Sequence, residues 1–453
     1  MQYVQIVIFI VSVFFFSLFE PLYHSNIIQS ASIGLNSVSS ISFDSIATLQ
    51  TEAVDILSKE SRQTPSFWKY FFLLIFFLSV DGLKILVEIY RRPTLRTFIS
   101  NPEDVTALIA CHDSAKTIKF TIEDLQKIIS NDRIIVVDDG SADDTYDIAK
   151  SMGVQVYRFE KNKGKVSAIN FGIYRVKTRY TLLLDDDTRV GPLHLPTSLL
   201  EHGYTGVAFN LLPCRRTREL NNGKNFVSCL QRYEYSKSME IGKRFQDGTL
   251  SVSCVSGGVG LFLTSRLNSM HHLHSTVFQG EDLERTLIEL LKGGKIAFVN
   301  QNVWTFAPDN WWDLTRQRLF NWYPGFYRNI DHFFKILFDR KLPIRLKGEM
   351  LYNIFVILTD PLRVYSFIAL IFFKQWEMLL FIYLFYLAIE IYPFIIVEKY
   401  LPVMRYYVPA LIAYPVYGIY NTILRSLALF VWLWNRFVTK RMKPKGHPGD
   451  RVA

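Results

Sequence analysis

The chain has 453 residues, of which 49% are hydrophobic, 20% are charged and 15% are aromatic. So high an apolar content excludes an intrinsically disordered protein, and four cysteines are too few for a disulfide scaffold. The 51 Lys and Arg residues and 41 Asp and Glu residues argue against a transporter that is embedded in the membrane throughout. The average composition fits no single class, which indicates two unlike parts in one chain.

An N-terminal membrane region is predicted over residues 1–92. Residues 4–19 form an apolar run that, with its flanks, reaches the roughly 20 residues of a membrane span. A cleaved signal peptide is the alternative, although the first five residues contain no Lys or Arg. A second span is expected over residues 67–90, and the pair of arginines directly after it indicates the cytoplasmic side. Residues 23–66 are then an external loop.

Residues 93–308 are expected to form a soluble, cytosolic domain. Its apolar, strand-like runs cover residues 105–110, 133–137, 154–159 and 180–184. Helical or loop segments separate these runs, and strands that alternate with helices indicate a parallel α/β sheet. The four cysteines all fall in this part and are expected to be reduced. The predicted fold class is therefore an α/β domain flanked by transmembrane α-helices.

The C-terminal part turns apolar again after a transitional segment. Residues 309–347 are expected to be interfacial amphipathic helices, because aromatic and cationic residues recur there at helical spacing. Residues 348–435 are expected to be a membrane region of three to four spans. Residues 436–453 form a basic tail, whose charge predicts a cytosolic location.

The number of C-terminal spans depends on residues 404–434. Two other candidate spans cover residues 351–373 and 378–397. The third stretch would be about 46 Å long as a straight helix, which is too long for one simple span. Only two or four C-terminal spans place the basic tail in the cytosol. We therefore expect residues 404–434 to divide into two segments near residues 417–421.

Paired carboxylates follow one of the predicted strands. Asp138 and Asp139 come directly after four apolar residues and are followed by a Gly-Ser turn. Ligands of parallel α/β sheets bind beyond the carboxyl ends of the strands, and Asp side chains there can accept hydrogen bonds from a base or a ribose. The alternative is that this turn only caps the helix that follows.

Three adjacent carboxylates, Asp185, Asp186 and Asp187, follow another predicted strand. In strand geometry Asp185 and Asp187 point the same way. Two oxygen ligands that face one point suit a hard cation such as Mg²⁺ or Mn²⁺, which also binds substrate phosphates. The pattern favours a metal site over a solvated acidic loop.

Two glycine-containing turns are candidate ligand contacts. Lys163 and Lys165 flank a glycine, where their cations could contact a diphosphate. Gly257 and Gly258 lie in a turn where the missing side chains would let the backbone approach a ligand closely. An ordinary basic surface loop and an ordinary hairpin are the respective alternatives.

A further pair of carboxylates, Glu281 and Asp282, lies at a loop-to-helix junction. A carboxylate there could serve as a general base or as a helix N-cap. Downstream, Arg318 and Trp322 belong to an aromatic and cationic segment, residues 310–323. Its Trp rings could stack on sugars while an Arg clamps a phosphate, or the segment could only lie on the bilayer.

In this order, these segments resemble membrane-bound family 2 glycosyltransferases, which include the hyaluronan, chitin and cellulose synthases. The motifs that carry the resemblance are residues 105–113, 136–141, 162–165, 185–187, 256–258, 280–282 and 318–322. Two motifs depart from the family. Arg318-Leu-Phe-Asn321-Trp322 stands where Gln-x-x-Arg-Trp is usual, and Asp113-Ser114 stands where Asn-Glu is common.

The resemblance implies a GT-A-like domain and a role for each motif. Asp113 and Asp139 would hold the uridine of a UDP-sugar and Lys165 would contact its diphosphate. Asp185 and Asp187 would be the pair associated with Mg²⁺ or Mn²⁺, with Asp187 closest. The remaining residues of the nucleotide-sugar site would be Asp138, Lys163, Asp185, Asp186, Arg318 and Trp322.

The resemblance also implies how the acceptor is bound and activated. Asp282, with Glu281 beside it, would be the general base that deprotonates the acceptor hydroxyl. Gly257, Gly258 and Trp322 would contact the acceptor.

The predicted function is inverting transfer of sugar from a UDP-sugar to a growing β-linked polysaccharide, with translocation of the product across a plasma or inner membrane. One alternative is a non-processive glycosyltransferase that acts on a lipid or lipid-carrier acceptor. Another is a transporter or receptor that only binds nucleotides. Expected partners are the donor, a polysaccharide or glycolipid acceptor and the bilayer, with a second copy or an accessory secretion protein as candidates. Membrane topology explains the net charge of +10 better than a nucleic-acid partner does.

Overall fold

The computed structural model describes residues 67–214, 225–275, 280–340, 342–401 and 404–438. The chain divides into two units, Met1–Trp68 and Lys69–Ala453, and the second contains almost all of the described residues. The expected first span, the external loop and most of the basic tail lie outside the described residues, so they stay predictions.

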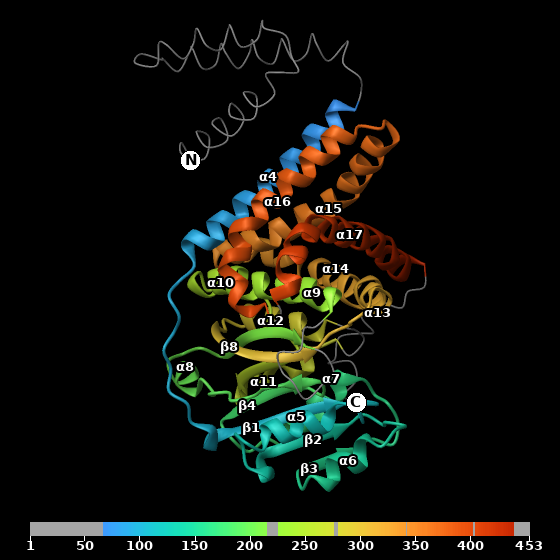
Figure 1. The fold of residues 1–453 in the computed structure, drawn as a ribbon. Coiled ribbons are helices and arrows are strands. Elements are labelled where there is room, and N and C mark those ends of the chain that lie inside the picture. Colours follow the sequence, from blue (N-terminus) through green and yellow to red (C-terminus); the bar gives the residue numbers. More distant parts are fainter. Residues whose placement is uncertain (1–66, 215–224, 276–279, 341, 402–403, 439–453) are drawn as a thin grey trace, which may run out of the picture. The chain divides into compact units, whose positions relative to one another are not determined.

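The second unit is built on one eight-stranded sheet (Figure 1). Its spatial order is β3-β2-β1-β4-β7-β6-β8-β5. The strands are β1 Val105–Cys111, β2 Ile134–Asp138, β3 Gln155–Arg158, β4 Tyr180–Asp185, β5 Thr188–Arg189, β6 Gly206–Cys214, β7 Val259–Leu263 and β8 Ile296–Phe306.

The four strands that the sequence predicts are present as β1 to β4, and they pair in parallel. The expected parallel arrangement is confirmed for these four strands, whereas β7, which the sequence did not predict, runs antiparallel to both β4 and β6. The apolar run of β7 follows a glycine-rich turn, and a short apolar run does not reveal the direction of its strand. The sheet is therefore mixed, within an α/β fold.

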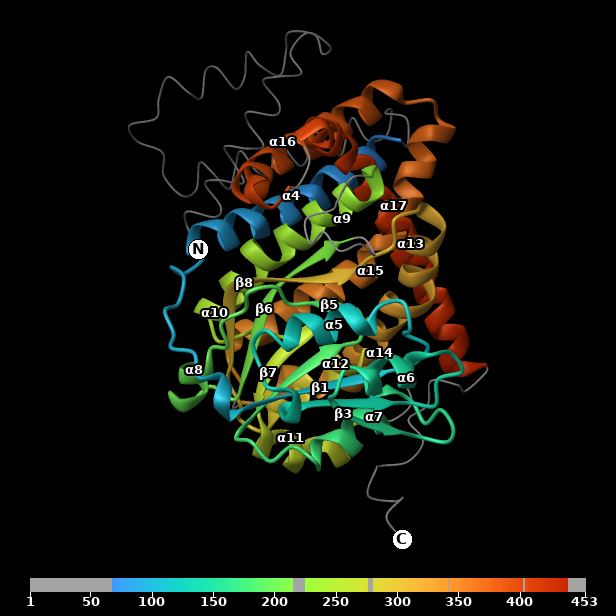
Figure 2. The same cartoon turned by 60° about the horizontal axis from the view of Figure 1, so that its bottom comes forward.

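Helices cover both faces of the parallel strands, which explains why all seven residues of β1 are buried. Helices α5 (Ile118–Leu125) and α6 (Thr145–Ser151) lie on one face, and α7 (Lys165–Ile173) lies on the other (Figure 2). Right-handed crossovers produce this arrangement, since the chain reverses direction across the sheet after β3. A Cβ on Gly172 would stand 2.2 Å from Leu108, so α7 packs on β1 only because a glycine is there.

The carboxyl ends of the parallel strands meet at one edge of the sheet. Cys111 at the end of β1 pairs with Asp138 of β2, and Ala110 pairs with Asp185 of β4. The residues that follow these strands are therefore neighbours in space. The shorter helices around the rest of the sheet are α8 Thr197–Glu201, α9 Phe226–Lys237, α10 Arg244–Gly248, α11 Thr264–Met270, α12 Glu281–Leu291, α13 Trp311–Gln317 and α14 Tyr323–His332.

The described part of the chain contains four helices long and apolar enough to cross a membrane. They are α4 Trp68–Arg91, α15 Ile344–Phe372, α16 Trp376–Val397 and α17 Met404–Phe437. Helices from the two ends of the chain are joined by polar contacts: Asp81 of α4 accepts hydrogen bonds from Tyr352 (2.8 Å) and Arg363 (3.3 Å) of α15.

The expected division of residues 404–434 into two segments is wrong, because α17 is one helix. Its two prolines, Pro409 and Pro415, lie inside the helix without ending it. Each removes a backbone hydrogen bond, but the residues around the expected break pack against neighbours. Tyr417 is buried in an apolar cluster, and Asn421 accepts a hydrogen bond from Tyr323 at 3.1 Å. Tertiary packing therefore keeps the helix continuous.

Candidate active site

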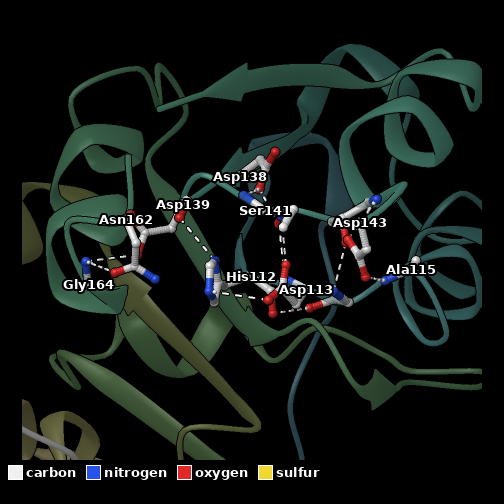
Figure 3. Close-up of polar contacts among 12 residues, drawn as sticks. His112, Asp113, Ala115, Asp138, Asp139, Ser141, Asp143, Asn162 and Gly164 are labelled. Carbon is white, nitrogen blue, oxygen red and sulfur yellow. Dashed lines mark hydrogen bonds and ion pairs between the residues drawn. The ribbon is translucent and has the colours of Figure 1, made fainter. Parts of the chain in front are cut away.

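One part of the site is formed where β1 and β2 end (Figure 3). Asp113 has a positive φ of 51°, which is unusual for a residue other than glycine. Its backbone N–H donates to Ser141 at 2.9 Å, and its carboxylate accepts from the N–H of Ala142 at 2.8 Å. The side chain remains 50% exposed. The strained turn therefore presents Asp113 to solvent beside the end of β2.

His112 connects the two strand ends. Its Nδ1 lies 3.0 Å from the carbonyl oxygen of Asp139, and its Nε2 lies 3.5 Å from the carboxylate of Asp113. The carboxylate of Asp139 accepts hydrogen bonds from the backbone N–H groups of Lys163 (2.7 Å) and Gly164 (2.8 Å). Asp139 thus fixes the loop that precedes α7, and it brings the two predicted nucleotide contacts, Asp113 and Lys163, to one region.

Asp138 has a different position from its neighbour, because its side chain is 0% exposed. Its carboxylate accepts hydrogen bonds from the backbone N–H (3.0 Å) and the hydroxyl of Ser141, and it pairs with Arg158 of β3 at 3.2 Å. The turn from Asp138 to Ser141 needs Gly140, since a Cβ there would stand 2.8 Å from the backbone of Asn162. Asp138 therefore holds the turn from inside the domain.

Lys165 lies at the centre of the second part of the site. Its Nζ is 2.6 Å from a carboxylate oxygen of Asp185 and 2.6 Å from one of Glu281. Burial disfavours the charge of Glu281, but Lys165 outweighs burial and lowers the pKa of Glu281 to about 2. Burial also opposes the charge of Lys165, yet the two carboxylates raise its pKa well above the usual value. Residues from α7, β4 and α12 are thereby joined in one ionic cluster.

The three adjacent aspartates do not continue as a strand, because β4 ends at Asp185 and a turn follows. Asp185 contacts Lys165. Asp186 accepts a hydrogen bond from the Ser114 hydroxyl, and Asp187 accepts one from the hydroxyl of Thr305 at 3.2 Å. The expectation of strand geometry throughout the run is wrong, since the turn separates the directions in which these carboxylates make contacts.

The acidic run carries strong mutual repulsion. Burial, followed by the charges of Asp185 and Asp186, raises the pKa of Asp187 to about 8. A divalent cation would offset this repulsion, and carboxylates are ligands that Mg²⁺ and Mn²⁺ prefer. Within the described ranges, no three His, Cys, Asp or Glu side chains are grouped as a metal site. The donor chemistry of Asp185 and Asp187 nevertheless fits the expected cation.

Asp282 lies in the first turn of α12, beside the glycine-rich turn before β7. One carboxylate oxygen accepts a hydrogen bond from the backbone N–H of Gly257 at 2.9 Å. Burial, followed by the charge of Glu281, raises the pKa of Asp282 above the usual carboxyl value. A partly buried carboxyl with a raised pKa has the property needed to take up a proton.

Gly257 has little space around it. A Cβ on Gly257 would stand 3.3 Å from the carboxylate of Asp185, 3.6 Å from Nζ of Lys165 and 3.7 Å from Cβ of Asp282. The next residue, Gly258, accepts a hydrogen bond through its carbonyl oxygen from Thr188 at 2.6 Å. The glycine-rich turn therefore borders both the ionic cluster and Asp282.

Arg318 and Trp322 form a separate group on the π-helical turn Arg318–Trp322. The guanidinium of Arg318 makes two hydrogen bonds to Glu234 of α9, at 3.0 and 2.7 Å, and lies 4.5 Å from the centre of the Trp322 ring. Burial raises the pKa of the Tyr235 hydroxyl. The positive charge of Arg318 opposes this rise, and the negative charge of Asp187 adds to it. The ring of Trp322 is 41% exposed and lies 5.9 Å from that of Tyr235.

The structure adds residues that the sequence motifs did not indicate. The Nζ of Lys243, which is buried, donates to the hydroxyl of Ser256 at 2.7 Å, and no ion pair with a described residue neutralises it. Burial lowers the pKa of Lys243. The thiol of Cys254 lies 3.8 Å from the carboxylate of Asp282. Lys243 ends a π-helical turn, a feature frequent at functional sites, but a π-turn has no clear sequence signature.

The chain is similar to known proteins over its central domain. Residues 106–260 match the model of the glycosyl transferase family 2. A poly-β-1,6-N-acetyl-D-glucosamine synthase of Staphylococcus aureus (strain COL) is 23% identical over 271 residues, which are 58% of this chain and 63% of the relative. The corresponding synthase of Staphylococcus epidermidis is 24% identical over 232 residues, 49% of this chain and 54% of that protein. The chain thus spans less than two thirds of the length of these relatives.

Solved structures give more distant matches. A mannosyltransferase from Pyrobaculum calidifontis, in complex with GDP-Man and Mn²⁺, has a TM-score of 0.49 and 12% identity, covering 81% of this chain and 96% of the other. Glucosyl-3-phosphoglycerate synthase from Mycobacterium tuberculosis has a TM-score of 0.34 and 18% identity, covering 50% of this chain and 79% of the other.

Proposed function

We propose that the chain, whose residues 106–260 match the glycosyl transferase family 2 model, is a glycosyltransferase that transfers sugar from a UDP-sugar to a growing β-linked polysaccharide, with inversion at the anomeric carbon. The observation that supports this most is the convergence of Lys165, Asp185, Glu281 and Asp282 around Gly257. Such a transfer requires a cationic side chain near the diphosphate, carboxylates that can bind a metal ion, and a general base.

The donor would lie across the carboxyl ends of β1, β2 and β4. Asp113, which is half exposed, would accept hydrogen bonds from the uridine. Asp139 would act by positioning the loop of Lys163 through its two backbone contacts. Lys165 would exchange a carboxylate partner for the donor diphosphate, since an ammonium binds either anion. Asp138, although predicted at this site, would contribute by fixing the turn.

The metal would be held by Asp185 and Asp187. A divalent cation there would offset the negative charge that develops on the leaving diphosphate. Asp186, bonded to Ser114, would keep the acidic turn in place beside the end of β1.

Asp282 would be the general base. As the acceptor oxygen forms its bond to the anomeric carbon, the bond from that carbon to the donor phosphate breaks and UDP leaves. Asp282 takes the proton from the attacking hydroxyl. Its hydrogen bond from Gly257 holds the carboxylate in place, and its raised pKa favours proton uptake.

The acceptor would enter past the π-helical turn Arg318–Trp322. An exposed Trp ring beside Tyr235 offers a surface on which a sugar can stack. Gly257 and Gly258 would line the approach to Asp282. The relatives named above are poly-N-acetylglucosamine synthases, so UDP-N-acetylglucosamine is the first donor to test. The domain would lie in the cytosol, and the product would pass outward beside the membrane helices.

The proposal can be tested with protein purified in detergent and a panel of radiolabelled UDP-sugars. A long polymer from one donor, formed only with Mg²⁺ or Mn²⁺ present, is expected. A lipid that carries one sugar would instead support the non-processive alternative. Binding of UDP without transfer or hydrolysis of any donor would contradict the proposal, provided that the protein is shown to be folded.

A further inference from the structure

The composition of α17 permits a membrane span, but α17 packs on α9 and α14 as well as on the candidate spans α15 and α16. Helix α15 starts at the catalytic domain, where Leu346 and Met350 join the domain core, and ends at the exposed Phe372. Helix α16 returns, because Val397 at its end packs in one cluster with Val227 of α9. These two helices therefore form a hairpin that leaves the domain and comes back to it.

The segment that leads into α17 lies on the domain. Tyr400 donates a hydrogen bond to Asn300 of β8 at 2.9 Å, and its ring packs with Leu212 and Cys214 of β6. Both strands belong to the central sheet. The chain therefore enters α17 from the same side of the membrane as the catalytic domain.

The middle of α17 also contacts the domain. Tyr417 donates a hydrogen bond to Glu234 of α9 at 2.7 Å. Tyr420 lies 2.7 Å from the hydroxyl of Thr315 on α13, and Asn421 accepts from Tyr323 of α14 at 3.1 Å. Helix α9 in turn is tied to the end of β8, since Gln231 and Asn225 at its start donate to the carbonyl oxygens of residues 308 and 309.

The end of α17 remains beside the same helices. The hydroxyl of Tyr327 donates to the carbonyl oxygen of Arg425 at 2.8 Å, and Arg436 pairs with Asp331 at 2.7 Å. Both partners are on α14, which contacts the catalytic domain through Asn329 and the carbonyl oxygen of Gly280 at 3.0 Å. From residue 417 to residue 436, a rise of about 28 Å, α17 thus keeps its contacts with elements of the domain.

The two faces of α17 differ in what they contact. One face is buried, and its residues recur at helical spacing: Ala410, Tyr414, Tyr417, Asn421, Leu424 and Ala428. The other is apolar and exposed, and its residues are Val408, Ile412, Val416, Ile423, Leu427, Phe430, Trp434 and Phe437. In both views α17 runs in a different direction from α4 and α16 (Figures 1 and 2). The exposed apolar stripe could enter the boundary between lipid headgroups and acyl chains, as the apolar face of an interfacial helix does.

We propose that α17 does not cross the membrane but lies in the bilayer interface on the side of the catalytic domain. Its exposed stripe would bind the boundary between lipid headgroups and acyl chains, next to the α15–α16 hairpin. Arg436, near the end of the helix, would then lie close to anionic headgroups. This arrangement also explains the basic tail, because two C-terminal spans return the chain to the side of the domain. It does not depend on the sugar or acceptor.

Depth measurements on spin labels test the proposal. Labels on cysteines that replace Val416, Ile423 and Phe430 would be compared in proteoliposomes of phosphatidylcholine and phosphatidylglycerol. The three depths are expected to agree within about 5 Å, since an interfacial helix lies at one depth. A crossing helix would spread labels 14 residues apart over about 21 Å. Labels at Leu380, Leu384 and Ile391 of α16 are the matched control and should show that graded profile.

A second measurement tests the sidedness of the helix end. Glu377→Cys lies in the first turn of α16, at the far end of the hairpin, and Val438→Cys lies directly after α17; both positions are exposed. In sealed vesicles of one orientation, an impermeant maleimide is expected to label only one of the two variants. Labelling of both from the same side, or a graded depth profile along α17, would overturn the proposal. The wild-type protein gives the background, since three of its cysteines are buried and Cys254 is partly buried. Neither measurement requires transferase activity.

Discussion

The site leaves little space for a side chain at Gly257, and adding one there should separate the effect of packing from that of chemistry. A Cβ there would stand 3.3 Å from the Asp185 carboxylate and 3.6 Å from Nζ of Lys165. Gly257→Ala therefore requires shifts of a few tenths of an ångström. Gly257→Val adds two methyl groups about 1.5 Å beyond Cβ, so Asp185 or Asp282 must move by about 1 Å.

The magnitude follows from that displacement. A misplacement of about 1 Å in an active site can cost about 100-fold in rate, and overpacking costs about 1–3 kcal/mol. We expect Gly257→Val to lower kcat about 100-fold or more and Gly257→Ala to lower it several-fold. The Michaelis constant of the donor should rise as well if Lys165 is displaced.

The assay is incorporation of radiolabelled sugar by purified protein, alongside thermal unfolding of each variant. Gly348→Ala is the matched control, because it adds the same methyl group in α15 where nothing lies within 4 Å. The control should retain wild-type transfer. Wild-type turnover by Gly257→Val would refute the reasoning, because the site could then not be packed around this glycine.

Other predictions concern single groups of the site and of the membrane interface. Asp282→Asn should lower transfer about 10²–10⁴-fold while UDP still binds in calorimetry; full transfer would exclude Asp282 as the base. Chelation should stop transfer and added Mn²⁺ should restore it, whereas activity in excess chelator would contradict a metal at Asp185. Lys237→Met leaves the carboxylate of Glu390, which is 1% exposed, without its 2.8 Å partner, and should destabilise the protein by about 3–5 kcal/mol. Lys237→Met with Glu390→Gln should unfold at a higher temperature than the single variant, and no recovery would indicate that the pair is not coupled.

Much of the sheet could be predicted because its strands carry a local signal. The runs that became β2 and β4 are apolar and end in carboxylates. The rule that parallel strands place their ligands at one edge predicted that those carboxylates lie close together. The direction of β7 could not be predicted, since pairing partners are distant in sequence. The continuity of α17 was missed for a related reason: Pro409 and Pro415 argue locally for a break, whereas tertiary contacts of Tyr417 and Asn421 maintain the helix.

The sequence motifs identified individual candidate residues of the site. They did not identify the contacts that the fold creates between residues distant in sequence. Asp185, Glu281 and Lys165 were each expected, but their shared ion pairs depend on three separate elements. Lys243 had no motif and became visible only through its burial and its bond to Ser256. Glu234, which holds Arg318, lies 84 residues away from it. A single sequence does not show such long-range partners.

The contact between Asp81 and Arg363 has a consequence for how the protein is made. These residues are 282 positions apart, so a ribosome that adds about 5–20 residues per second needs roughly 14–56 s between them. If α4 crosses the membrane, as its length and composition permit, it does so with a carboxylate whose partner has not yet been synthesised. Its insertion would then depend on a temporary environment, in the translocation machinery or at the lipid surface, that tolerates this charge until α15 arrives.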